Sequence, residues 1–180
     1  MHSKTKIHIA ITIAVMAFIF LQSALPGDLS GAESGLLVNI LHEITGIDPN
    51  ILSVLVRKIA HFTEYMILGI CLQKNADDWK NNALGSNSIA RSSNSIAHSS
   101  NSNISGCNNA RASSDNADGS ASAIKYSLCV WAVGAIYSVT DEIHQMFVPG
   151  RACAPLDMLI DSAGVAAGVI IAGMMANSKK

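Results

Sequence analysis

Long apolar runs separated by polar stretches dominate the pattern of this chain, and four of them predict helices that cross a membrane. The first run, residues 7–25, contains no Lys, Arg, Asp or Glu and has nearly the length of about 20 apolar residues that a spanning helix needs. A cleaved signal peptide has the same basic start, but Ser23-Ala24-Leu25 is a poor cleavage site, so we favour an uncleaved span. The other predicted spans are residues 51–72, 124–140 and 156–176. We expect an all-α integral membrane bundle of four transmembrane helices.

A shorter apolar pattern lies between the first two spans. Its large aliphatic side chains recur at the spacing of a helix. They are Leu36, Leu37, Ile40, Leu41 and Ile44. The pattern predicts a short amphipathic helix that lies on the membrane surface or packs against the bundle.

Residues 74–123 differ in kind from the rest of the chain. They contain 13 Ser and 10 Asn, and a degenerate seven-residue repeat begins at Ser86, Ser93 and Ser100. Such a composition buries too little apolar surface to offset the entropy of ordering the chain. We interpret this stretch as a disordered low-complexity loop, with a small repetitive β-structure as the alternative. It divides a single domain into 1–73, with two spans, the loop 74–123, and 124–180, with the other two.

Composition supports the membrane interpretation and removes other classes of protein. The chain is 49% hydrophobic and only 14% charged, whereas soluble domains carry about a quarter charged residues. A net charge of −1 disfavours a nucleic-acid partner. None of the four cysteines has C-x-x-C spacing, so neither a zinc cage nor a disulfide framework is indicated. They are Cys71, Cys107, Cys129 and Cys153.

The distribution of basic residues predicts the orientation. Four spans place both termini and the 74–123 loop on one side, which then holds nine basic residues against four acidic ones. The opposite side and its border hold three basic residues against nine acidic ones. Because basic residues are enriched on the cytoplasmic side, we expect a multi-pass protein of the cell membrane with both termini cytoplasmic.

Ionisable residues from three predicted spans converge at the outer border. Arg57, His61 and Glu64 share one face of the second span. The third span ends in a face with three polar residues, and the fourth begins with two aspartates, while Arg151 lies between these two spans. These residues are Asp141, His144, Gln145, Asp157 and Asp161. Intramembrane charges usually mark a functional site, although each residue also has a structural interpretation as an interhelical clamp, an interfacial anchor or a helix cap.

Two segments resemble the signatures of VanZ-like membrane proteins. The first runs from Arg57 to Gly69 and reads R-K-I-A-H-F-T-E-Y-M-I-L-G. The second runs from Asp141 to Arg151 and reads D-E-I-H-Q-M-F-V-P-G-R, followed by Asp157 and Gly164. The resemblance implies a small multi-span membrane protein. A founding member is associated with glycopeptide (teicoplanin) resistance, which makes such a link an expectation here.

The resemblance also implies a set of functional residues. Two features depart from the family pattern, because Asp161 stands where Asn is usual and the Ser/Asn-rich loop is unusually long. The positions that match the family motif are Lys58, His61, Glu64, Tyr65, Asp141, Glu142, Gln145, Arg151 and Asp157.

We consider three functions for this set of residues. In the first, an anionic envelope lipid or lipid-linked precursor binds at the outer border through a ligand-binding set. That set is Arg57, Lys58, Tyr65, Gln145, Arg151 and Asp157. In the second, an enzyme acts on such a lipid by general acid–base chemistry with His61, Glu64, Asp141 and Glu142. A metal-dependent version would add His144, but the spacing matches no strong metal motif, and we predict neither metal nor cofactor. The third is a purely structural bundle. The expected partners are membrane lipids, and the oligomeric state stays open.

Overall fold

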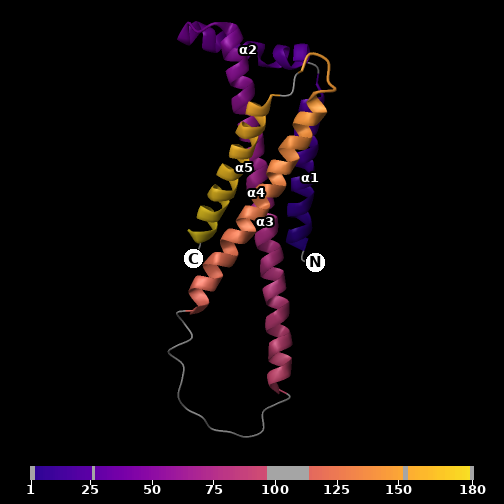
Figure 1. The fold of residues 1–180 in the computed structure, drawn as a ribbon, viewed down its shortest axis with the longest axis vertical. Coiled ribbons are helices and arrows are strands. Elements are labelled where there is room, and N and C mark those ends of the chain that lie inside the picture. The colour runs from indigo at the N-terminus through magenta and orange to yellow at the C-terminus, as the bar shows by residue number, and fades with distance from the viewer. Residues whose placement is uncertain (1–2, 26, 97–113, 152–153, 179–180) are drawn as a thin grey trace.

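The computed structural model describes residues 3–25, 27–96, 114–151 and 154–178, and its regular elements there are all helices. The all-α prediction is therefore confirmed. The helices are α1 (Ser3–Ala24), α2 (Gly27–Thr45), α3 (Pro49–Ile96), α4 (Ser114–Gln145) and α5 (Pro155–Asn177). Four of them run alongside one another in alternating directions, while α2 lies across one end (Figure 1). The start of α1 and the end of α5 lie toward the other end of the bundle.

Glycines bring α3 and α5 into close contact. A Cβ atom on Gly164 would lie 2.6 Å from the backbone oxygen of Phe62, and one on Gly168 would collide with that of Met66. Gly69 on α3 meets the backbone of Val165 in the same way. Small residues at such positions let the backbones of membrane helices approach. This contact sets the spacing of the two helices that carry most of the charged residues described below.

The interior of the bundle combines an apolar core with buried polar groups. Ile19, Tyr65, Leu68 and Val165 are buried near its centre, while Ser23, Ser138, Asp141, Glu142, Gln145 and Asp161 are buried as well. Large aliphatic side chains cover much of the outside, for example Ile13, Ile136 and Ile170. An apolar exterior around buried polar groups is the arrangement expected of helices in lipid.

Among the residues that the structure describes, two helices have the length and apolar composition needed to cross a membrane. They are Thr5–Ala24 within α1 and Pro155–Asn177, which is α5. The spans predicted at 51–72 and 124–140 lie inside the longer helices α3 and α4, where charged and polar residues interrupt the apolar sequence. The number of four spans therefore stays a prediction.

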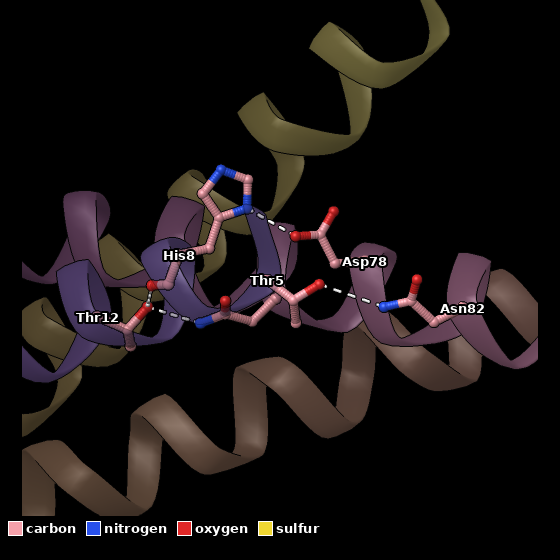
Figure 2. Close-up of polar contacts among 6 residues, drawn as sticks. Thr5, His8, Thr12, Asp78 and Asn82 are labelled. Atoms are coloured by element: carbon pink, nitrogen blue, oxygen red, sulfur yellow. Dashed lines mark hydrogen bonds and ion pairs between the residues drawn. The ribbon is translucent and has the colours of Figure 1, made fainter. Parts of the chain in front are cut away.

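Much of the stretch predicted to be disordered is helical, which corrects that prediction. α3 continues from residue 74 to Ile96, and α4 begins at Ser114; residues 97–113 lie outside the described residues. The reason lies in α1, whose polar side chains face α3 (Figure 2). His8 Nδ1 lies 2.7 Å from Asp78 Oδ2, and Asn82 donates to the Thr5 hydroxyl at 3.2 Å. These contacts support the helix as far as Asn82 without the apolar burial that the composition lacks.

A tight turn joins α4 to the segment before α5. α4 ends at Gln145, and hydrogen bonds from Val148 N to Gln145 O (3.0 Å) and from Arg151 N to Val148 O (3.2 Å) continue the chain as turns. Gly150 has a φ of 77°, a left-handed conformation that glycine adopts without steric cost. The turn directs Arg151 back over the end of the bundle.

Candidate functional site

A charged cavity of about 240 Å³ opens at the end of the bundle where α3 begins, α4 ends and α5 begins. The residues that line it come from all three helices and from the turn after α4. They are Arg57, Lys58, His61, Glu142, Gln145, Gly150, Arg151, Asp157, Ile160 and Asp161. Of the side chains that the sequence places in one layer, the cavity gathers Arg57, His61, Gln145, Arg151, Asp157 and Asp161, but not Glu64, Asp141 or His144.

The α3 face supplies three basic or polar side chains, and one of them is neutralised. Arg57, Lys58 and His61 occupy two successive turns of α3 and point to the cavity. Lys58 Nζ forms an ion pair with Asp157 Oδ1 in the first turn of α5. Pro155 begins that helix at a position where its missing N–H costs nothing. The Lys58–Asp157 pair therefore ties the first turn of α5 to the early part of α3.

The two arginines of the cavity have no carboxylate partner within the described ranges. The only ion pairs there are Lys58–Asp157 and His8–Asp78. Arg151 Nη2 donates to the backbone oxygen of Gln22 at 3.3 Å, and its buried Nε has no partner. Burial lowers the pKa of Arg151, and Arg57 lowers it further by repulsion. Asp141, Glu142 and Glu64 act in the opposite direction and raise the pKa of Arg151. The cavity therefore contains two cations that repel each other and form no direct ion pair within the described ranges, with carboxyl groups at longer range.

Two deeply buried carboxyl groups form the inner wall. Glu142 is 1% exposed and Asp161 is 3% exposed. Glu142 Oε1 accepts a long hydrogen bond of 3.5 Å from Ala154 N, while Glu142 Oε2 and Asp161 Oδ1 have no hydrogen-bond partner. Burial raises the pKa of Glu142, against the lowering effect of the Ala154 N–H. A carboxyl group in the protonated state donates a hydrogen bond, so this wall can offer a donor to a bound oxygen.

Asp141 belongs to a hydrogen-bond cluster behind the cavity. Its Oδ2 accepts from Ser23 Oγ at 2.7 Å and from Gln145 Nε2 at 3.3 Å, and Gln145 Nε2 also lies 3.2 Å from Ser23 Oγ. Gln145 links the cluster to the cavity, because it takes part in these hydrogen bonds and also lines the cavity. Sequence reasoning missed Ser23 and Gln22 as site residues, although they are polar residues near the end of the first apolar run, and the structure brings Gln22 to Arg151 and Ser23 to Asp141.

Three other residues singled out from the sequence lie outside the lining of the cavity. Tyr65 is fully buried in the core, and its ring centroid lies 6.1 Å from that of Tyr137. His144 stacks on Phe20 with centroids 4.3 Å apart, and Glu64 is half-buried one turn below His61. Within the described part of the chain, no three His, Cys, Asp or Glu side chains are placed to hold a metal ion, so the ligand set of the metal-dependent hypothesis is not gathered.

These features together define the class of protein. A bundle with an apolar exterior, two helices that can cross a membrane and a charged cavity between helices is a helical membrane protein. A family model described as VanZ/LLP1 matches residues 8–176, so the chain belongs to the VanZ/LLP1 family, as its two motifs predict. No curated protein and no solved structure matches the chain.

Proposed function

We propose that this VanZ-family protein binds the anionic headgroup of an envelope lipid or lipid-linked precursor at the outer border of the cell membrane. The observation that carries the proposal is the pair Arg57 and Arg151, which line one cavity without a carboxylate partner in the described ranges. Guanidinium groups bind phosphate and carboxylate through paired hydrogen bonds. An anion between them would relieve their mutual repulsion.

The other cavity residues support an anionic ligand with hydroxyl or ester oxygens. Lys58 is already paired with Asp157, so it serves as a rigid wall rather than as a free cation. Glu142 offers a donor when protonated, and Gln145 offers an amide from the same side. A cavity of about 240 Å³ is smaller than the roughly 300–1,000 Å³ of pockets for drug-sized ligands. Its size therefore suits a headgroup rather than a whole lipid.

The proposed topology has four spans, both termini in the cytoplasm and the cavity facing outward. The alternating directions of α1, α3, α4 and α5 (Figure 1) and the excess of basic residues at the opposite end support it. A reporter fused within residues 86–122 should then read cytoplasmic. An extracytoplasmic reading would reverse the orientation and place the cavity on the inner side.

A lipid-binding experiment tests the function. Wild type and the Arg57→Gln/Arg151→Gln double variant would be purified in phosphatidylcholine nanodiscs, and binding of phosphatidic acid measured by native mass spectrometry. With about 1 kcal/mol per charge contact, the double variant should lose about 30-fold in affinity. Lys125→Gln removes an exposed cation outside the cavity and should bind as wild type does. Equal binding by all three proteins would refute the proposal.

In the cell, such binding would alter the display of envelope precursors and so the sensitivity to glycopeptides such as teicoplanin. We expect Arg151→Ala to remove any such phenotype while the protein still inserts. If a strain that produces only this variant kept its normal resistance, the cavity would not be responsible for the phenotype.

Enzymatic action on the same lipid is a second candidate, favoured by His61. Its side chain lines the cavity beside both arginines, and its buried Nδ1 has no hydrogen-bond partner. An imidazole is suited to general acid–base catalysis near neutral pH. Lipid mass spectrometry on cells with and without the protein decides between the two functions. A lipid species that wild type produces and His61→Ala does not would establish turnover.

A further inference from the structure

Buried polar atoms without a hydrogen-bond partner gather around the charged cavity. In the described ranges, several residues that line it each hold such an atom. The atoms are His61 Nδ1, Glu142 Oε2, Arg151 Nε and Asp161 Oδ1. Proteins pair most of their buried polar atoms, because a group that has lost its water without gaining a partner is costly. The concentration of unpaired donors and acceptors around one cavity points to a polar ligand that both donates and accepts hydrogen bonds.

The cations and the carboxyl groups lie at different depths of the cavity. Arg57 and Arg151 are half-buried, whereas Glu142 is 1% exposed and Asp161 is 3% exposed. Asp161 follows Asp157 by about one turn of α5, which places it about 6 Å further from the start of that helix. The cavity therefore has guanidinium groups toward its mouth and carboxyl groups on its inner wall.

A hydroxyl group is the ligand group that suits the inner wall. It both donates and accepts, so it pairs with a carboxyl group in either protonation state. A phosphate alone meets the arginines and leaves the carboxyl groups unpaired, while a neutral polyol leaves the arginines without an anion. A ligand that carries both groups, with hydroxyls beyond its phosphate, matches the order of the side chains in the cavity.

We propose that the cavity selects a lipid whose phosphodiester headgroup carries a short polyol such as glycerol. The phosphate lies between Arg57 and Arg151, and the polyol hydroxyls pair with the two carboxyl groups. The inference rests on the proposed function and extends it, because it names the headgroup and makes Glu142 and Asp161 specificity-determining residues. At about 30 Å³ for each water-sized group, a cavity of about 240 Å³ has room for a phosphate and a short polyol. The polyol is the free end of such a headgroup, so it enters the cavity ahead of the phosphate.

Two lipids of equal charge test the headgroup. Phosphatidylglycerol carries the polyol, and phosphatidylpropanol has the same carbon skeleton in its headgroup without the hydroxyl groups. Each would be added to the full-length protein in phosphatidylcholine nanodiscs, and binding measured by native mass spectrometry. Wild type should bind phosphatidylglycerol about fivefold or more tightly than phosphatidylpropanol, the factor that one hydrogen bond of about 1 kcal/mol supplies.

Variants on α5 assign this preference to the inner wall. Asp161→Leu should weaken binding of phosphatidylglycerol about fivefold and leave that of phosphatidylpropanol unchanged, because both arginines remain. Asp161→Asn keeps a donor and an acceptor and should keep the preference. Ser162→Ala changes a neighbour outside the lining of the cavity and should bind as wild type does.

The outcomes separate the headgroup from the proposed function. If wild type binds the two lipids equally, or if Asp161→Leu keeps the full preference, the polyol headgroup is refuted and the proposed function stands. If wild type binds neither lipid in preference to phosphatidylcholine, both are refuted. If Asp161→Leu does not insert, the comparison of the two lipids in wild type and in Asp161→Asn still decides.

Discussion

Replacing Gly168 by alanine tests the contact that holds α3 against α5. The new Cβ atom would lie 2.9 Å from Ile70 N, about half an ångström short of the ordinary 3.4 Å contact, and closer still to Met66 O. Both are backbone atoms, so no side chain can rotate away and the helices must separate. Such overpacking costs about 1–3 kcal/mol.

Gly173→Ala on the same helix is the matched control, because nothing lies within 4 Å of its Cβ position. Both variants gain the same roughly 1 kcal/mol of helix propensity that alanine has over glycine, so the difference between them isolates the clash. Gly168→Ala should therefore be less stable than Gly173→Ala by about 1–3 kcal/mol.

Thermal unfolding of the detergent-solubilised proteins measures this difference. At about 2–4 °C per kcal/mol for a chain of this size, the midpoint of Gly168→Ala should lie roughly 2–12 °C below that of Gly173→Ala. Because α3 and α5 carry Lys58 and Asp157, Gly168→Ala should also bind phosphatidic acid more weakly. Identical midpoints and identical binding would show that α3 and α5 are not in backbone contact, and would refute the packing on which the cavity depends.

Three further predictions concern polar groups. Burial raises the pKa of Glu142 above its ordinary 4.5. The folded state therefore retains this proton to higher pH than the unfolded state does, and the free energy of unfolding should fall as pH rises above about 4.5. Glu142→Gln should flatten this dependence in unfolding measured across pH, and an unchanged slope would contradict the role of Glu142. Ser23→Ala leaves buried Asp141 without its 2.7 Å donor and should lower the free energy of unfolding by about 1–3 kcal/mol. The control Thr63→Ala removes an exposed hydrogen bond to Ile59 O and should lower it by less than about 0.5 kcal/mol. Equal losses of stability would contradict the buried cluster. Thr5→Val/Thr12→Val removes the two hydroxyl groups that accept hydrogen bonds from Asn75 and Asn82 of α3. Amide hydrogen exchange should become faster at residues 74–82, while residues 60–70 keep their rates. Unchanged exchange at residues 74–82 would mean that other contacts hold this segment.

The regular parts of the fold could be predicted because each has a local cause. Apolar runs at 7–25 and 156–176 correspond to α1 and α5, and Pro149-Gly150 lies in the turn that follows α4. The charged layer could also be foreseen, since helical spacing alone places Arg57 and His61 on one face. The order of the spans also placed Arg151 and Asp157 in the same layer, and the family motifs include both residues.

What could not be predicted depends on partners distant in sequence. The helical state of residues 74–82 depends on Thr5, His8 and Thr12 of α1, which no local composition reveals. Depth along the predicted spans groups Asp141 with His61, but in the structure Asp141 lies behind the cavity, where Ser23, 118 residues away in the chain, donates to it. That Arg151 forms no ion pair within the described ranges likewise depends on how the helices pack, which the sequence does not reveal.

The length of α3 has a mechanical consequence. Its 48 residues extend for about 72 Å, more than twice the roughly 30 Å thickness of a hydrocarbon core. Gly69, in contact with α5, divides this rod into a short arm of about 18 Å to Arg57 and a long arm of about 40 Å to Ile96. Contacts with α1 along the long arm, at Asn75, Asp78 and Asn82, hold it in line with the bundle. A straight helix of this length must extend well beyond a hydrocarbon core.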